Sequence, residues 1–283
     1  MRRHPAGLPE TLTAINRTLV MGVINVTSDS FSDGGKFASV DSAIKHAHYL
    51  TDSGADLVDV GGESTRPGAQ RVSLDEELSR VMPVVTKLVS DGIVVSVDTM
   101  RAEVAKQAIA AGVHLINDVS GGLADSGMFS VIAQSEVPYI MMHWRAHSAE
   151  MMEKSHYFDV VNDVTAELLS QVNKALSAGI ASEHIVLDPG LGFAKLPEQN
   201  WPLLSRINEL QELGYPILIG ASRKRFLGEL LAQGDKPRDV LDREAATIAV
   251  SALMAHADVW ALRVHDCRTT RDAVAVVEQL RRS

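Results

Sequence analysis

Eight short apolar runs, spread along the whole chain, constrain the fold more than any other feature of the sequence. They lack alternating polar residues, which is typical of strands buried on both faces of a parallel sheet. Stretches with helical spacing lie between the runs, for example at Leu74, Leu78 and Val81. Ser73 with Glu76 has the pattern of a capping box and marks the start of that helix. The runs cover residues 19–26, 57–60, 93–97, 113–116, 139–142, 185–187, 216–219 and 260–264.

Eight runs that alternate with helical segments predict a single α/β domain of the (β/α)8 TIM barrel class. The main alternative is an open, doubly wound sheet. Such a sheet usually carries a glycine-rich dinucleotide fingerprint after its first strand, and none follows residue 26. No linker rich in proline or serine divides the 283 residues. We therefore expect residues 1–17 to form an N-terminal tail or a plug at the barrel bottom, and residues 18–283 to form the barrel.

Composition excludes several classes of partner. The formal net charge of −9 argues against general nucleic-acid binding, which requires clustered Lys and Arg. Cys267 is the only cysteine, so no disulfide can form within the chain, as is usual in a reducing compartment. No apolar run reaches the ~20 residues of a membrane span, and no secretory signal is recognisable. We expect a cytoplasmic protein with small-molecule substrates and no membrane or nucleic-acid partner.

A polar or ionisable side chain closes each of the eight runs. In a TIM barrel the chemistry takes place where strands end, because the eight strand ends meet at one mouth. A single polar residue there is usually a helix cap, but Lys and Arg cannot cap a helix N-terminus, so a full ring predicts a mouth that binds a polar ligand. The ring consists of Asn25, Asp59 with Glu63, Asp98, Asn117 with Asp118, His143, Asp188, Ser222 with Arg223 and Lys224, and Arg263 with His265 and Asp266.

The ring separates into two parts by charge. Its carboxylates and amide suit the N–H and NH2 edges of a flat nitrogen heterocycle. Its cations suit a phosphate group, which many barrels bind after strands seven and eight. Two long loops rich in glycine and hydroxyl groups, residues 27–35 and 61–68, belong to the same mouth and suit lids over a substrate. The first part comprises Asp98, Asn117 and Asp188, and the second comprises Arg66, Arg263 and His265.

Eight segments resemble the signature motifs of the dihydropteroate synthase family, which binds pterins in a TIM barrel. The resemblance extends from about Leu19 to Ala275, and each motif falls in the expected order on its own strand. Trp144 and Arg145 after the fifth run look like the actinobacterial branch, whereas Ser28 stands where the family usually has proline and loosens the first loop. The segments are MGVINVTSDSFSDGG (21–35), DVGGESTRPG (59–68), SVDT (96–99), IND (116–118), MH (142–143), LDPGLGF (187–193), GASRK (220–224) and RVHD (263–266).

The resemblance implies a transferase of folate biosynthesis that joins 6-hydroxymethyl-7,8-dihydropterin diphosphate to p-aminobenzoate and releases diphosphate. It also implies a homodimer, and a Mg²⁺ ion ligated by the side-chain oxygen of Asn25. The implied catalytic residues are Asp98, Lys224, Arg263 and His265. The implied binding residues are Asp98, Asn117, Met142, Asp188, Phe193 and Lys224 for the pterin, Asn25, Arg66, Arg263 and His265 for the diphosphate, and Phe31, Thr65, Pro67, Ser222 and Lys224 for p-aminobenzoate.

Two other functions stay open at this point. A methyltetrahydrofolate:corrinoid methyltransferase also uses a pterin-binding barrel, but it has no diphosphate to hold, and the segments 64–67 and 263–265 argue against it. A catalytically silent paralogue usually loses loop or anion-site residues, and here each expected one is present. For a synthase we expect dissociative substitution, with Asp98 and Asp188 stabilising positive charge on the pterin methylene. We expect His143 to support the structure rather than to act in the reaction.

Overall fold

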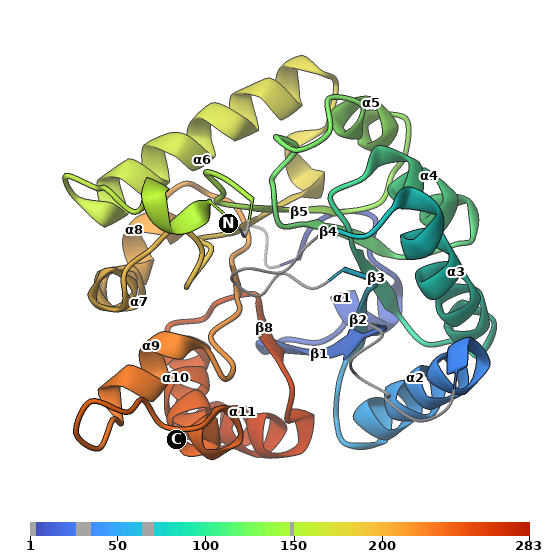
Figure 1. Ribbon diagram of the computed structural model, residues 1–283. Helices are drawn as coiled ribbons and strands as arrows, with labels where there is room; N and C mark the ends of the chain where they lie inside the picture. The colour runs from blue at the N-terminus through green and yellow to red at the C-terminus, as the bar shows by residue number, and fades with distance from the viewer. Residues whose placement is uncertain (1–3, 27–34, 64–70, 148–149) are drawn as a thin grey trace.

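The structure, a computed structural model, describes residues 4–26, 35–63, 71–147 and 150–283 (Figure 1). Its strands are all parallel and form one sheet in the order β6-β5-β4-β3-β2-β1-β8-β7. An isolated bridge between Leu187 and Ile217 joins the two edges, so the sheet closes into a barrel with helices outside it (Figure 1). The predicted TIM barrel is confirmed. The strands are β1 (Leu19–Asn25), β2 (Leu57–Gly61), β3 (Val95–Asp98), β4 (Leu115–Asp118), β5 (Tyr139–Met142), β6 (Ile185–Asp188), β7 (Leu218–Ile219) and β8 (Ala261–Val264).

The strands are buried on both faces, as the apolar runs predict. Every residue within the strands β2, β3, β4, β5, β6 and β7 is buried. The exceptions are Asn25, which is exposed at the end of β1, and Arg263, which is partly exposed in β8. Both residues lie in the C-terminal half of their strands. The exposed strand residues therefore lie toward the barrel mouth.

Helices alternate with the strands around the barrel. Ser73 caps the second long helix, because its side chain accepts a hydrogen bond from the Glu76 backbone N–H at 3.2 Å. Only half of the predicted capping box forms, since the Glu76 carboxylate pairs with Arg80 instead. In the described ranges, no helix is both long and apolar enough to cross a bilayer. The helices are α1 (Glu10–Thr13), α2 (Gly35–Asp52), α3 (Leu74–Ser90), α4 (Ala102–Ala110), α5 (Met128–Ala133), α6 (Val160–Ser177), α7 (Asn200–Ser205), α8 (Ile207–Gln211), α9 (Arg225–Leu230), α10 (Glu244–His256) and α11 (Cys267–Arg282), with 3-10 turns η2 (Met151–Lys154), η3 (Ser182–His184), η4 (Pro197–Gln199) and η5 (Val240–Arg243).

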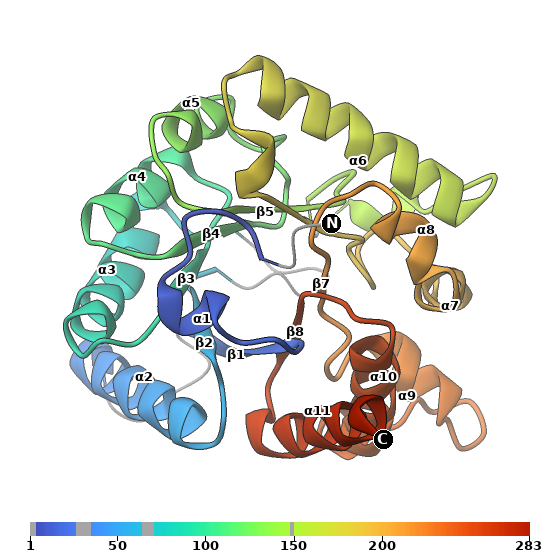
Figure 2. The ribbon, with the colours of Figure 1, turned by 180° about the vertical axis from the view of Figure 1, so that it is seen from behind.

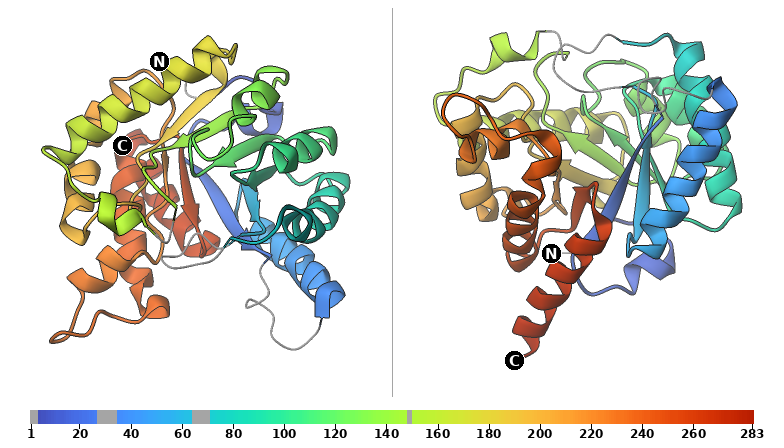
Figure 3. Two further views of the ribbon diagram at one scale, coloured as in Figure 1. Left: turned by 45° about the horizontal axis from the view of Figure 1, so that its top comes forward. Right: turned by 60° about the horizontal axis from the view of Figure 1, so that its bottom comes forward.

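The N-terminal segment closes one end of the barrel. In Figure 2, which shows the molecule from behind, α1 lies across that end, and the right-hand view of Figure 3 places it opposite the strand C-termini. Leu12 packs with side chains inside the barrel, among them Met21 and Leu57. His4 is buried, and its ring bonds both the Ile15 carbonyl and the indole N–H of Trp260. A ligand can therefore reach the barrel interior only from the mouth at the other end.

Candidate active site

Polar side chains from four strands, three of them ionisable, meet at the barrel mouth. Arg263 on β8 donates from Nε to Asp59 Oδ2 at 2.6 Å and from Nη2 to Asp98 Oδ2 at 2.8 Å. Asn117 on β4 donates from Nδ2 to the same Asp59 oxygen at 2.9 Å. Both carboxylates and the amide are buried. The guanidinium thus lies between two buried carboxylates, where it orients both of them.

Asp59 anchors this cluster, although the sequence indicates no ligand role for it. It lies in the middle of β2 and is 0% exposed, and its Oδ1 has no hydrogen-bond partner among the described residues. A buried carboxylate is strongly unfavourable unless it is paired, so Asp59 fixes the positions of Arg263 and Asn117. A carboxylate inside an otherwise apolar barrel strand was the sequence signal for this role.

Asp188 and Lys224 form a second part of the mouth. They meet beside Gly220, where an added Cβ would lie 4.0 Å from both Asp188 Oδ2 and Lys224 Nζ. The lysine donates to the Leu191 carbonyl and lies 4.7 Å from the centre of the Phe193 ring. Lys224 therefore joins the loop after β7 to the loop after β6.

Burial changes the charge states in this mouth. Desolvation raises the pKa of Asp98 to about 7, although the nearby Arg263 opposes the shift. It also raises the pKa of Asp188, which Lys224 opposes. Desolvation lowers the pKa of Lys224 to about 8, with Asp188 acting in the opposite direction. Several groups therefore change protonation close to neutral pH, as is common where side chains bind or transform a ligand.

Half of the remaining residues expected at the site lie at the same mouth. Met142 pairs in register with Asp188 across β5 and β6. Ser222 Oγ lies 3.0 Å from His265 Nδ1 and accepts from the His265 backbone N–H at 3.3 Å. Asn25 is exposed at the end of β1. The expected residues Phe31, Thr65, Arg66 and Pro67, and Ser28 in the first loop, lie outside the described residues.

One expectation about the division of the mouth needs correction. The sequence places Arg263 among cations apart from the carboxylates, yet the structure bonds it directly to Asp59 and Asp98. The reason is that only β1 lies between β2 and β8, so the long Arg263 side chain can reach across β1 to Asp59. The two parts of the mouth meet at Arg263.

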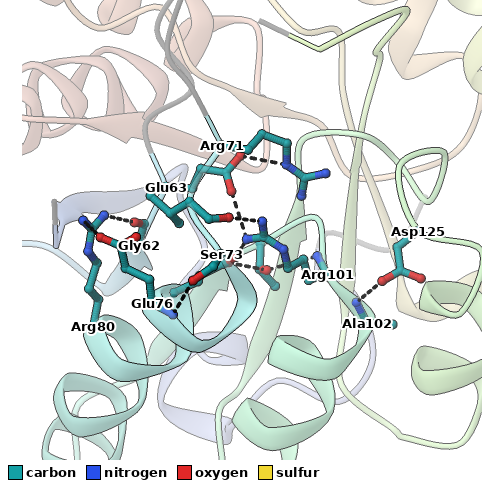
Figure 4. A network of polar contacts seen from close by, with 12 residues as sticks. Gly62, Glu63, Arg71, Ser73, Glu76, Arg80, Arg101, Ala102 and Asp125 are labelled. Atoms are coloured by element: carbon teal, nitrogen blue, oxygen red, sulfur yellow. Dashed lines mark hydrogen bonds and ion pairs between the residues drawn. The ribbon is translucent and has the colours of Figure 1, made fainter.

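Ion pairs hold the two ends of the connection between β2 and α3 (Figure 4). Arg101, just before α4, donates to Glu63 at 3.0 Å and also contacts Glu77. Arg71 donates to the other Glu63 oxygen at 3.2 Å. Glu77 is buried and accepts from the Thr99 hydroxyl at 2.6 Å. Arg101 thus ties both ends of this connection to the end of β3, next to the site.

We expect Arg101→Met to lower the free energy of unfolding by about 1–3 kcal/mol, because the buried Glu77 carboxylate would keep only a hydroxyl partner. Urea unfolding measures this change. Arg71→Met is the matched control, since the Arg71 side chain is 36% exposed and its ion pair is worth little. If both variants are equally stable, Arg101 does not hold the network.

Comparison with known proteins agrees with a pterin site. The family model for pterin binding enzymes matches residues 21–265. A dihydropteroate synthase from Mycobacterium leprae is 51% identical over 262 residues, which cover 91% of this chain and 92% of the relative. The chain belongs to the dihydropteroate synthase family. The resemblance seen in the sequence motifs is confirmed.

Solved structures of the dihydropteroate synthase family share the fold. One from Clostridium difficile, determined in the presence of pteroic acid, has a TM-score of 0.87 and 42% identity and covers 95% of this chain and 98% of that chain. One from Xanthomonas albilineans with 4-aminobenzoic acid has a TM-score of 0.87 and 41% identity, with coverage of 95% and 94%. This chain is accordingly a transferase with dihydropteroate synthase activity.

Proposed function

We propose that this chain carries out dihydropteroate synthesis at the C-terminal mouth of its barrel. The reaction joins 6-hydroxymethyl-7,8-dihydropterin diphosphate to p-aminobenzoate and releases 7,8-dihydropteroate and diphosphate. The observation that carries the proposal is the convergence of buried carboxylate, amide and cationic side chains from distant parts of the sequence at this mouth. These side chains are Asp98, Asn117, Asp188, Lys224 and Arg263.

The pterin ring would bind to the buried polar residues. Asp98 and Asp188 would accept hydrogen bonds from its N–H and amino groups, which are strong when the acceptor is charged. The hydrogen bond from Asn117 to Asp59 fixes the orientation of the Asn117 amide, so its carbonyl oxygen can also face the ring. Met142 and Phe193 would supply apolar contacts, and Lys224 would complete the pocket.

The diphosphate would leave before the new bond forms. Arg263 and His265 would neutralise its negative charge, which makes it a better leaving group. As the C–O bond breaks, positive charge spreads from the methylene into the ring, where Asp98 and Asp188 would stabilise it. The amino group of p-aminobenzoate is neutral at about pH 7, so it needs placement more than deprotonation. After the C–N bond forms, the amine nitrogen carries an extra proton that the departing diphosphate can accept, so no protein side chain is required as a general base.

p-Aminobenzoate would bind second, beside Ser222 and Lys224. The hydrogen bond between Ser222 and His265 links this side of the mouth to the diphosphate side. Phe31, Thr65 and Pro67 are proposed for the same pocket on family resemblance.

We propose Asn25 as the protein ligand of Mg²⁺. The carboxamide is exposed at the end of β1, and its oxygen is a hard donor of the kind that Mg²⁺ accepts. Across the described ranges, no group of three or more His, Cys, Asp or Glu side chains forms a metal site. This donor set fits an ion held mostly by water and substrate phosphates, as is usual for Mg²⁺. When bound, Mg²⁺ would neutralise charge on the diphosphate.

Release of diphosphate in the presence of both substrates and Mg²⁺ tests the proposal. We expect one diphosphate for each dihydropteroate formed, and none when p-aminobenzoate is left out. No release together with intact pterin binding would instead indicate a silent pterin-binding paralogue. Methyl transfer from methyltetrahydrofolate to a corrinoid would indicate the methyltransferase.

We further propose that the chain forms a homodimer through its last helices. Large apolar side chains are exposed on η5, α10 and α11, with Leu241, Leu253 and Leu280 exposed by 75%, 64% and 65%. α10 and α11 pack against each other, and in Figure 1 they lie at the bottom of the view, away from α6 at the top left. Exposed apolar surface of this kind commonly marks an interface between proteins.

Analytical ultracentrifugation measures this association. We expect the wild-type protein to sediment as a dimer and Leu253→Glu to sediment as a monomer, because an unpaired carboxylate in the interface would oppose association. Leu169→Glu, at a 37% exposed leucine on α6, is the matched control and should stay dimeric. A monomeric wild-type protein would disprove the proposed dimer.

A cytoplasmic location is proposed on the basis of the single thiol. Cys267 is buried, and desolvation raises its pKa to about 12, so it stays protonated and unreactive. A chain with one inert cysteine suits a reducing compartment. Cell fractionation tests the location, and recovery outside the cytoplasm would contradict it.

A further inference from the structure

Lys195 is a buried lysine that the proposed reaction does not use. It lies two residues after Phe193, in the segment that leads from β6 toward α7, and it is 3% exposed. Its Nζ has three partners, His143 Nδ1 at 3.0 Å and the Gly190 and Phe193 carbonyl oxygens at 3.1 Å each. A buried lysine is costly unless its donors are used, and here three partners surround it.

The geometry around Lys195 requires its ammonium form. His143 Nε2 lies 2.9 Å from Glu167 Oε2, and a carboxylate can only accept, so the ring proton belongs on Nε2. Nδ1 is then an acceptor, as are the two carbonyl oxygens. A neutral amine has two N–H bonds and cannot donate to three acceptors, whereas an ammonium can.

The same segment carries two side chains of the pterin pocket, Asp188 and Phe193. Its backbone is partly strained, because Ala194 has a φ of 48°, in the left-handed region that disfavours residues with a Cβ. The Tyr157 hydroxyl donates to the Ala194 carbonyl at 3.0 Å. Contacts with Lys195 and Tyr157 therefore hold a conformation that the segment would not adopt alone.

We propose that Lys195 is a positioning residue of the pterin pocket, which fixes the segment carrying Asp188 and Phe193 through the Gly190 and Phe193 carbonyls and His143. The proposal rests on the assignment of these two side chains to the pterin. Lys195 itself does not touch the substrate. Loss of its three contacts lets the segment relax and weakens pterin binding, while the proposed p-aminobenzoate contact at Ser222, after β7, remains.

The positioning effect is expected to depend on pH. Burial and, to a smaller extent, the nearby ammonium of Lys224 lower the pKa of Lys195 to about 7. As the pH rises through this value, Lys195 loses one donor hydrogen and one of its contacts, so pterin affinity falls. Asp98 and Lys224 also titrate near neutral pH and contribute to the same profile. The groups that face Lys195 are His143 directly after β5, Arg145 and Tyr157 before α6, Glu167 on α6, Asp188 on β6 and Lys224 after β7.

Lys195→Met tests the proposal, since it keeps the length of the side chain and removes its donors. We expect KM for the pterin diphosphate to rise about tenfold, equivalent to about 1.4 kcal/mol, with kcat and the KM for p-aminobenzoate nearly unchanged. The fall of pterin affinity above neutral pH should become shallower, because Lys195 no longer loses a proton there and only Lys224 still does. Lys174→Met, at an exposed lysine of α6, is the matched control and should behave as wild type.

Three results would overturn the proposal. They are an unchanged pterin KM in Lys195→Met, an equal rise of KM for both substrates, and no recovery in Lys195→Arg, which keeps the charge. Calorimetric binding of pterin needs no turnover, so it tests Lys195 even if diphosphate release fails. If Lys195→Met does not fold, ¹⁵N NMR of wild-type His143 decides, because a proton on Nδ1 below neutral pH would contradict the geometry.

Discussion

An Arg263→Ala variant is expected to lose dihydropteroate synthesis and to unfold with about 3–5 kcal/mol less free energy than the wild-type protein. The guanidinium is the partner of Asp59, which is 0% exposed, and of Asp98, which is buried. Removing it leaves two carboxylates close together without a cation. Urea unfolding and diphosphate release measure the two effects.

A second variant separates stability from catalysis. Asp59→Asn combined with Arg263→Met removes one buried charge along with its partner, so we expect part of the lost stability to return. Activity should stay low, because the diphosphate then lacks the Arg263 guanidinium that would neutralise its charge. Since Arg263 is bonded to Asp98, binding of 6-hydroxymethylpterin without diphosphate should weaken as well. If that binding is unchanged, Arg263 acts on the diphosphate alone.

An Asp98→Ala variant is expected to bind pterin about 1.5–3 kcal/mol more weakly, or about 10- to 150-fold, because a buried charged hydrogen bond is lost. Isothermal titration with pterin measures the change. Binding of p-aminobenzoate in the presence of a pterin and diphosphate should change far less. Wild-type pterin affinity would remove Asp98 from the pocket.

The pH profile gives a further check on Asp98. Its pKa is raised to about 7, so the carboxylate form decreases as the pH falls through that value. We expect pterin affinity to decline below about pH 7 in the wild-type protein, because a protonated Asp98 accepts fewer hydrogen bonds. In Asp98→Asn, which cannot titrate, this decline should be absent.

The barrel could be predicted because its strands have a recognisable sequence pattern. Strands buried on both faces are continuously apolar, and the observed strands begin and end within two residues of the predicted runs. The polar residue at the end of each run also marks the mouth, which places Asn117 and Asp188 correctly without knowledge of the register. Helix capping was less predictable, since Glu76 pairs with Arg80 rather than with the helix end.

Contacts between distant strands could not be predicted. Arg263 pairs in register with Met21, and Asp59 pairs with Val23, so the arginine lies two residues from the aspartate along the intervening strand. This offset follows from the stagger of a closed barrel, which a single sequence does not reveal. The burial of Lys195 could not be predicted either, because its partner His143 lies 52 residues earlier, directly after β5.

The closed N-terminal end of the barrel limits where substrates can enter and where the product can leave. Because α1 and Leu12 seal that end, both substrates enter and the product leaves through one opening. The pterin end of dihydropteroate would occupy the same side chains as the next pterin diphosphate, which we propose to be the buried Asp98, Asn117 and Asp188. A dihydropteroate molecule therefore has to depart before the next pterin diphosphate can bind. We expect residual product to compete with the first substrate.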